Sequence, residues 1–442
     1  MSKVVLISPP YMKLSYPNYE MPIALTKGCD YMNPGLLIST SILTKNNISN
    51  KIIKITNPSN KNEVIQSIDF DTIFVGISCT CSWEYLEALK IAEIIKNKYP
   101  KIKIALSGWQ VKSIKEKVFL DSENIDYIIL GDAEYTIENL YKKIINNSNE
   151  QICSVIEKNN ANKNNFYKSP KIEFEVIDFR LFPNYDKYIP YVEESRNCPY
   201  SCEFCLNSCV VDKYQIVPFE IFVQNVELLE KIYGPDAKAN LLAANFGVNS
   251  IETQKKLEYL KTKKIKWNIE LHVDNNWEYY INDLRAAGIV KVSIGFESGS
   301  LTTLRLMNKT KNPENYLIRL KELLNRLNEQ GIKPSLNLLI DYRDNIETIK
   351  ETLLFLEEHR NQIHKVKANF MFGFGDIINN IDYDYLPNII IDEYGKKIHA
   401  YPVLPNNLTL KEISVIINKI ENGDYSTEYL DNIQGFKKKL KL

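Results

Sequence analysis

The sequence predicts an α/β protein with two α/β units and a small C-terminal subdomain. Short β-branched runs alternate with amphipathic helical stretches, the alternation stops in an Asn- and Lys-rich stretch near 157–169, and it then resumes. With 44% hydrophobic and 25% charged residues among 442, the composition is that of an ordinary globular protein. We expect 1–155 to be the first unit, 156–187 a linker, 188–372 the second unit and 373–442 the subdomain.

The first unit is predicted to be a doubly wound, Rossmann-like parallel sheet. Its apolar runs are continuous, as expected for strands buried on both faces, and Pro34 fits the first turn of a helix. The predicted strands are Val4–Ser8, Lys51–Thr56, Thr72–Cys79, Ile102–Leu106 and Tyr127–Leu130, and the predicted helices are Pro34–Thr44, Trp83–Lys98 and Thr136–Ile145.

Ligands of such sheets bind beyond the carboxyl ends of the strands. The loops expected there contain small residues that let a bulky ligand approach the backbone, although the same residues also form tight turns. The candidate ligand-binding residues of these loops are Thr80, Ser107, Gly108, Trp109, Gly131 and Glu134.

The second unit is predicted to contain six strand–helix repeats, whose functional residues should lie at the carboxyl ends of the strands. The strands are expected at Ile189–Ser195, Ala239–Ala244, Lys266–Val273, Lys291–Phe296, Lys333–Ile340 and Lys365–Phe372, and the helices at Pro218–Tyr233, Ile251–Thr262, Trp277–Ala287, Asn312–Gln330 and Ile346–Arg360. The subdomain contains a helical run at Lys411–Glu421, and we expect it to cap the open face of the second unit.

Three cysteines form the most specific motif of the chain. Cys198, Cys202 and Cys205 have the spacing Cys-x3-Cys-x2-Cys, and three thiolates so close together can bind three irons of a [4Fe–4S] cluster and leave the fourth iron open. Buried free thiols, a disulfide and half of a zinc site are the alternatives. Zinc normally takes four protein ligands, no histidine lies within sixty residues of the triplet, and Cys209 is the one plausible fourth thiolate.

Two polar residues of the third strand are candidate acid/base or substrate contacts. Glu270 and His272 occupy alternate positions, so their side chains share one face of the strand. A single buried histidine is more often structural, which is the alternative for His272. Asn337 and Asp341 are similar candidates at the fifth strand.

The cysteine motif, with Phe204 before its third cysteine and Ile189–Ser195 before its first, resembles the radical SAM superfamily. Ile294–Ser300, followed by Met307–Lys309, resembles the fourth-strand motif of that family's partial (β/α)6 barrel. The resemblance implies that the open iron chelates the amine and carboxylate of S-adenosylmethionine (SAM). It also implies that one electron from the cluster cleaves SAM to a 5′-deoxyadenosyl radical, and that a flavodoxin- or ferredoxin-type protein donates the electron.

The resemblance further implies which residues contact SAM. Glu297 and Ser298 should lie near its ribose or methionine, although helix initiation and capping are the alternative roles. The second strand lacks the acidic pair often found in the family, so Asn245 is expected to contact the SAM amine weakly. Phe204 and Asn337 are the remaining candidate cofactor contacts.

The first unit resembles the cobalamin-binding domain that precedes many radical SAM barrels. The resemblance rests on Pro9-Pro10-Tyr11, Pro34–Leu37, Val75–Ser78 and Gly131–Thr136. The sequence departs from the family pattern in two places: Ser107–Gln110 stands where the family has Gly-Gly-x-His, and Asp132-Ala133 stands where it has Glu-Gly. The family's motif Asp-x-His-x-x-Gly is missing, and no histidine precedes His272. We therefore expect no histidine ligand to cobalt, and Trp109 should pack against the corrin or fill its space.

Charge and hydropathy exclude some classes of protein. Lys plus Arg and Asp plus Glu both number 55, which argues against general nucleic-acid binding. No stretch approaches the roughly 20 apolar residues of a membrane span. The apolar run Val4–Ile7 is too short for a signal peptide, and the clustered thiols favour a reducing cytoplasm.

The leading hypothesis is a cobalamin-dependent radical SAM methyltransferase that acts on an unactivated carbon of a small natural product, amino acid or peptide. By this resemblance one SAM methylates cobalamin, and a second SAM gives the radical that activates the substrate. A radical SAM enzyme of another reaction, such as cyclisation, rearrangement or C–S or C–C bond formation, is the first alternative. A non-catalytic iron–sulfur carrier or sensor and a nucleic-acid-modifying enzyme are the others.

Overall fold

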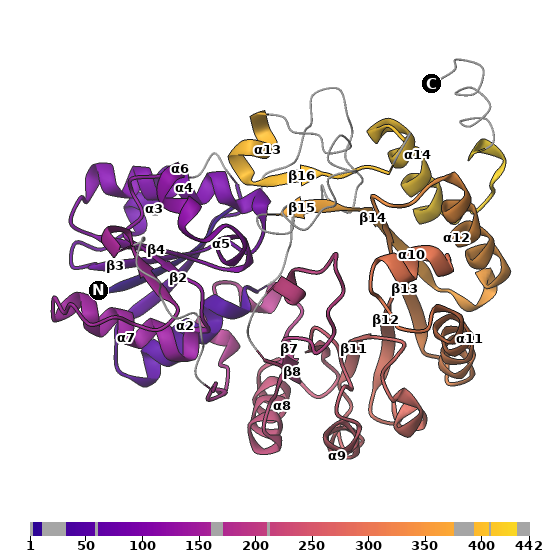
Figure 1. The fold of residues 1–442 in the computed structure, drawn as a ribbon. Coiled ribbons are helices and arrows are strands. Elements are labelled where there is room, and N and C mark those ends of the chain that lie inside the picture. Colours follow the sequence, from indigo (N-terminus) through magenta and orange to yellow (C-terminus); the bar gives the residue numbers. More distant parts are fainter. Residues whose placement is uncertain are drawn as a thin grey trace.

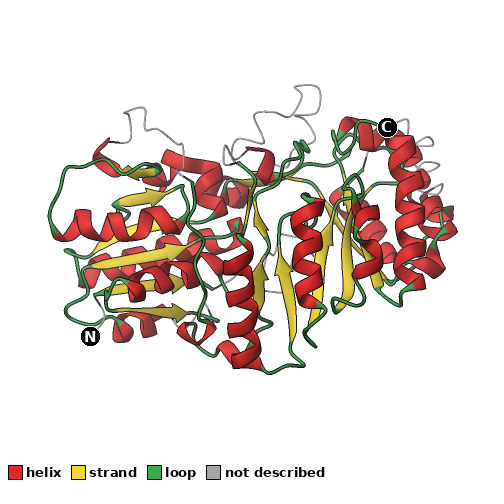
Figure 2. Ribbon diagram, turned by 90° about the horizontal axis from the view of Figure 1, so that it is seen from below, coloured by secondary structure: helices red, strands yellow, loops and turns green. Residues whose placement is uncertain are grey.

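The computed structural model describes residues 3–10, 32–57, 61–160, 171–209, 213–374, 393–405 and 408–430. Two six-stranded sheets lie side by side, each flanked by helices (Figure 1; Figure 2). The predicted α/β class is therefore confirmed. Tyr11 and the Asn-rich stretch 161–170 of the expected linker lie outside the described residues.

The N-terminal sheet has the strand order β2-β1-β3-β4-β5-β6. Its strands are β1 (Val4–Ser8), β2 (Asn50–Lys54), β3 (Phe74–Ser78), β4 (Lys103–Ser107), β5 (Tyr127–Ile129) and β6 (Val155–Glu157). The five predicted strands are present and parallel, but the short β6, which the sequence did not predict, pairs antiparallel with β5. The sheet is thus mixed rather than wholly parallel.

Helices cover both faces of this sheet, which explains why β1 and β3 in its interior are buried throughout, whereas the edge strand β2 is only partly buried. The helices are α2 (Pro34–Lys45), α3 (Lys61–Ser67), α4 (Ser82–Lys98), α5 (Trp109–Ile114), α6 (Val118–Asp121) and α7 (Ala133–Ile145). Val4 and Leu6 face the core that contains residues of α2 and α7, whereas Val5 and Ile7 face the core with α4. As predicted, Pro34 is in the first turn of α2, and the Asn33 side chain caps this helix.

The second sheet is an open, partial barrel of six parallel strands, in the order β7-β10-β11-β12-β13-β14. The strands are β7 (Tyr191–Glu193), β10 (Lys238–Leu242), β11 (Lys266–Leu271), β12 (Ile289–Glu297), β13 (Lys333–Ile340) and β14 (Lys365–Phe370). The flanking helices are α8 (Phe219–Tyr233), α9 (Ser250–Leu260), α11 (Pro313–Glu329) and α12 (Ile346–Glu358), and the short α10 (Leu301–Leu306) follows β12.

The helix predicted at Trp277–Ala287 is wrong. This segment forms two short 3-10 turns, Trp277–Tyr279 and Ile281–Asp283. Its apolar residues recur at intervals of three and four, which suits an α-helix, but a spacing of three also suits 3-10 turns. Trp277 and Tyr280 are fully buried, and the Trp277 indole donates to the Val273 carbonyl, so tertiary packing fixes the tighter turns.

The C-terminal segment bridges the two sheets. β15 (Phe372–Phe374) pairs with β16 (Ala400–Pro402), and α14 (Leu410–Glu421) packs on β14 (Figure 1). The preceding helix α13 (Glu393–Ile398) packs instead against α4 of the N-terminal sheet. The Gln110 side chain donates to the Ile398 carbonyl at 2.8 Å, so this segment contacts both units rather than capping the barrel alone.

No helix in the described ranges combines the length and the apolarity that a membrane crossing requires.

Candidate functional site: a cysteine loop at the mouth of the barrel

The three cysteines lie on one loop between two short strands, β8 (Ser195–Arg196) and β9 (Gln215–Ile216). The pairing of these strands closes the ends of the loop directly after β7. Asn197 has a φ of +63°, in the left-handed region that asparagine tolerates, and its side chain donates to the Lys213 carbonyl. A turn bond from the Cys205 amide to the Cys202 carbonyl at 3.1 Å brings the last two cysteines close together.

None of the three cysteines is in a disulfide bond. Burial raises the pKa of each, to about 11 for Cys202, while the nearby Lys309 lowers each of these pKa values. The Tyr200 and Asn207 amides hydrogen-bond to Cys198 and Cys205. Such thiols stay protonated until a metal displaces their protons.

The surroundings of the three cysteines suit a negatively charged group. The Tyr200 and Asn207 amides donate to Cys198 and Cys205, and the Lys309 ammonium group lies over Phe204 of the same loop. In a [4Fe–4S] cluster three such thiolates would each bind a different iron. Within the described ranges, no group of three His, Cys, Asp or Glu side chains could hold a single metal ion. The Cys209 side chain lies outside the described residues.

The turn after α10 supports the cysteine loop. The Met307 carbonyl accepts the Glu203 amide at 3.0 Å, and the Asn308 side chain donates to the Ser201 carbonyl at 3.0 Å. Lys309 then lies over the Phe204 ring, 5.8 Å from its centroid. The motif around Met307–Lys309 is thus in contact with the cysteine motif, although about a hundred residues separate them in the chain.

Glu297 and Ser298 lie at the carboxyl end of β12. Glu297 accepts from Lys309 at 3.1 Å and has a φ of +61°, so the helix-initiating alternative does not describe it. Ser298 shares a hydrogen bond of 2.9 Å with Thr352 and accepts the Ser300 amide. Ser300 caps α10. Ser298 therefore stabilises this loop.

Asn245 and His272 form a buried link under the cysteine loop. Asn245 accepts the His272 amide at 3.0 Å, and it exchanges hydrogen bonds with the Asn275 side chain, so both ends of its amide are used within the protein. The His272 ring stacks on Tyr200 of the cysteine loop, with centroids 4.1 Å apart. Burial, with a contribution from Lys309, lowers the pKa of His272 to about 2.

The structure separates the roles of Glu270 and His272. His272 is neutral near pH 7 and cannot exchange a proton there as an acid/base pair would require. Glu270 faces the barrel interior, where solvent reaches its carboxyl group even though the surrounding protein raises its pKa. Asn337 is half-buried on β13, next to Lys367 in register. Glu270 and Asn337 are therefore the predicted residues available to a substrate inside the barrel.

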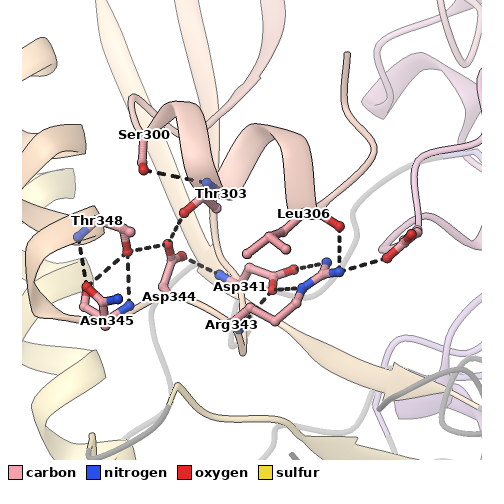
Figure 3. Close-up of polar contacts among 9 residues, drawn as sticks. Ser300, Thr303, Leu306, Asp341, Arg343, Asp344, Asn345 and Thr348 are labelled. Carbon is pink, nitrogen blue, oxygen red and sulfur yellow. Dashed lines mark hydrogen bonds and ion pairs between the residues drawn. The ribbon is translucent and has the colours of Figure 1, made fainter. Parts of the chain in front are cut away.

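The loop after β13 is tied to the cysteine loop by Arg343, a residue that sequence reasoning missed. Arg343 donates to Glu203 at 2.7 Å and to Asp341, which is fully buried, at 2.7 Å. Figure 3 shows Arg343 beside Asp341 and the Leu306 carbonyl. Asp341 therefore orients Arg343 and is not free for acid/base chemistry.

A second cluster in the same loop is centred on Asp344. It accepts from the hydroxyl groups of Thr303 and Thr348 and from the Asp341 amide, and thus joins the first turns of α10 and α12 (Figure 3). Burial raises the pKa of Asp344 to about 6.

The candidate residues of the N-terminal sheet lie at its carboxyl edge, and α5, which begins at Trp109, contacts the segment Leu206–Cys209 that follows the third cysteine. Thr80 donates its amide and hydroxyl to Glu84, and the Ser107 carbonyl accepts the Cys79 amide. Gly108 has a φ of +104°, and a Cβ there would lie 2.2 Å from the Cys79 carbonyl oxygen. A Cβ on Gly131 would lie 2.7 Å from that of Ser154. Both glycines therefore serve close packing within the protein.

Trp109 and its neighbour occupy the start of α5. The Trp109 ring is half-buried and lies under the Lys112 ammonium group. Gln110 is buried and accepts from Ser82 at 2.6 Å while it donates to Ile398. The residue that stands where the related family has histidine is thus used to hold the C-terminal segment.

Glu134 connects the N-terminal sheet to the cysteine loop through Arg196. The Arg196 guanidinium group lies 2.9 Å from Glu134, 3.3 Å from Asp132 and 2.7 Å from Glu193. Burial raises the pKa of Glu134, and Arg196 lowers it. Arg196 precedes the first cysteine by two residues, so this ion-pair cluster fixes the edge of one sheet against the metal-binding loop of the other.

A cavity of about 320 Å³ adjoins this cluster. It is lined by Asp132 of the β5–α7 loop, by Thr136 in the first turn of α7, and by Ser154 and Lys171. Its volume is at the lower end of the range for small-molecule sites and can accommodate only part of a corrinoid.

Comparisons with known proteins agree with this geometry. The model of the radical SAM superfamily matches residues 192–356, from β7 into α12, so this part of the chain is a radical SAM domain. Such a domain implies a [4Fe–4S] cluster and SAM as cofactors. No curated protein matches the chain by sequence.

Two solved enzymes share the fold of most of the chain. One is the radical SAM methyltransferase TsrM from Kitasatospora setae, solved with tryptophan and a SAM analogue. The match covers 84% of this chain and 73% of TsrM, with 15% sequence identity and a TM-score of 0.65. The other is the cobalamin-dependent SAM radical enzyme OxsB, solved with aqua-cobalamin and SAM; it is 16% identical, with a TM-score of 0.71, over 91% of this chain and 64% of OxsB. These matches establish the two-unit architecture.

Proposed function

We propose that this chain is a cobalamin-dependent radical SAM enzyme, in its simplest form a methyltransferase acting on an unactivated carbon. The supporting observation is the combination of a cysteine loop inside a radical SAM domain with a Rossmann-like sheet that Arg196 ties to that loop. TsrM and OxsB share this architecture over most of the chain.

In this proposal Cys198, Cys202 and Cys205 hold the cluster, which supplies one electron to bound SAM. The substrate is a small natural product, amino acid or peptide placed inside the barrel, where Glu270 is accessible. A flavodoxin- or ferredoxin-type protein in the reducing cytoplasm donates the electron. Arg343 and Arg196 act as positioning residues, because they hold the cysteine loop from two sides.

Cobalamin would bind at the carboxyl edge of the N-terminal sheet. Trp109 stays a candidate contact there, but Glu134 is engaged by Arg196, and Gly108 and Gly131 pack against the protein. Gln110 stands where the related family has histidine, so the lower face of cobalt would have no histidine ligand.

The close packing of Gly108 and Gly131 favours one alternative. If these loops leave no room for a corrinoid, the chain is a radical SAM enzyme of another reaction type, such as cyclisation, rearrangement or C–S or C–C bond formation.

Anaerobic reconstitution distinguishes the two. The chain is reconstituted with iron, sulfide and cobalamin, and its absorption spectrum is recorded. SAM and a chemical reductant are then added, and the products of SAM cleavage are measured. Retained corrinoid together with 5′-deoxyadenosine and S-adenosylhomocysteine supports the methyltransferase. Formation of 5′-deoxyadenosine without retained corrinoid would leave the alternative.

The ligand assignment makes a prediction of its own. Replacing Cys198, Cys202 and Cys205 together with Ala should abolish the four-iron cluster, measured by bound iron, bound sulfide and the electron paramagnetic resonance (EPR) spectrum. Cys209→Ala is the matched control and should retain the cluster, because a fourth thiolate would close the iron that SAM needs. A cluster that survives in the triple variant contradicts the assignment.

A further inference from the structure

Lys309 is a buried cation at the cysteine loop. It is 5% exposed, its ammonium group lies 3.1 Å from Glu297, and the Phe204 ring lies beneath it. A buried ammonium group is costly unless it is paired, so an arrangement that keeps one beside a metal-binding loop calls for an explanation.

Two features of the backbone make room for this ion pair. A Cβ on Gly295 would lie 2.7 Å from the Lys309 nitrogen and 3.0 Å from the Glu297 carboxylate, so any other residue there would displace this ion pair. Glu297 itself has a φ of +61°, which is unfavourable for a residue with a side chain. Both features place Lys309 and Glu297 together against the loop.

The two residues before Lys309 hold its backbone beside the cysteine loop. The Met307 carbonyl accepts the Glu203 amide, and the Asn308 side chain donates to the Ser201 carbonyl. The electrostatic effect of Lys309 also reaches all three cysteine thiols. Its charge is thus fixed relative to the atoms that bind iron.

We infer that Lys309 is the counter-cation of the cluster and that the Lys309–Glu297 pair sets the reduction potential of the cluster. The inference rests on the cluster of the proposed function but not on cobalamin or methyl transfer. Reduction adds one negative charge to a cluster that already carries three thiolates, so a fixed cation stabilises the reduced form more than the oxidised form. Glu297 opposes this effect because it partly neutralises the cation.

Two substitutions should therefore shift the potential in opposite directions. Lys309→Met keeps the length of the side chain and removes its charge, so the midpoint potential should become more negative. Glu297→Gln leaves the cation uncompensated, so the midpoint should become more positive. The measurement is an anaerobic redox titration of the reconstituted protein without SAM, followed by EPR.

Two controls separate charge at this position from general effects. Lys309→Arg keeps the charge and should stay near the wild-type potential. Lys291→Met makes the same charge change at the opposite end of β12 and should leave the potential unchanged.

The outcomes are decisive for the inference. Shifts of the same sign in Lys309→Met and Glu297→Gln, or no shift in either, would overturn it. If Lys309→Met fails to retain iron and sulfide, the Glu297→Gln variant alone tests the inference. A midpoint potential of Glu297→Gln that does not rise above the wild-type value would then overturn it. A wild-type protein that holds no cluster would instead contradict the proposed function.

Discussion

His272 illustrates how burial changes what a residue can do. From the sequence it was a candidate acid/base residue on the same strand face as Glu270. In the structure it is enclosed between Tyr200 and Tyr316, and the Asp274 amide donates to its Nδ1 atom. It therefore supports the cysteine loop as a neutral ring.

The low pKa of His272 predicts a pH dependence of stability. Its folded-state pKa is about 2, whereas an unfolded histidine has a pKa near 6.5, so the unfolded chain binds a proton that the folded chain does not. This costs the fold about 1.4 kcal/mol for each pH unit below 6.5.

The test is urea denaturation of wild type and His272→Gln at pH 7.5 and 5.5. The wild type should lose about 1.4 kcal/mol more than the variant between these values, because one unit of the range lies below 6.5. Tyr200→Phe keeps the stacked ring and should retain the wild-type dependence. Equal losses in wild type and His272→Gln would show that His272 is not held neutral.

At the level of single residues, the sequence predicted what is local. The cysteine spacing is contained in eight residues, and the three cysteines lie on one loop. The partners of that loop were not predictable, because Arg343 reaches Glu203 over 140 positions and Arg196 reaches Glu134 over 62. No pattern in one sequence indicates which of 55 basic residues makes such a contact.

Among the helices and strands, the best predictions were for segments with a clear apolar pattern. β1 and β13 have the predicted bounds: β1 is an apolar run that ends at Ser8, and β13 places the buried Leu336, Leu338 and Ile340 at alternate positions. β6 has only three residues and no period to detect. The 3-10 turns after Trp277 were mistaken for a helix because both structures place residues three apart on one side.

Asp344, which joins α10 and α12, predicts a pH dependence of stability opposite to that predicted for His272. The pKa of Asp344 is about 6 in the fold and ordinarily 3.8, so the folded chain binds a proton between these values. The free energy of unfolding therefore increases as the pH falls through 6, by about 1.4 kcal/mol for the first pH unit below 6.

Asp344→Asn removes this titration. Relative to the variant, wild type should gain about 1.4 kcal/mol of unfolding free energy when the pH is lowered from 7 to 5. Urea denaturation at both pH values checks this, with Glu347→Gln as a control that removes an exposed charge of α12 and retains Asp344. A constant difference between wild type and Asp344→Asn contradicts the assignment.

Across the whole molecule, Arg196 is a polar link between the two sheets. It holds Asp132 and Glu134 of one unit and Glu193 of the other. Arg196→Met would leave these partly buried carboxylates without their cation, and such losses cost about 3–5 kcal/mol. The control, Arg180→Met, removes an exposed pair with Asp178 and should change stability little.

Chemical denaturation of both variants measures this difference. If Arg196→Met is as stable as Arg180→Met, the two units are held together by other contacts.

The contact between Gln110 and Ile398 also affects how the chain reaches its fold. It joins positions 288 residues apart, and the segment around Ile398 packs on α4 near the start of the chain. During synthesis the N-terminal sheet can form early, but its contacts with this segment must wait until nearly the entire chain has left the ribosome. Until then the buried amide of Gln110 lacks its acceptor, so the newly made N-terminal unit is incomplete for most of the time needed to translate the protein.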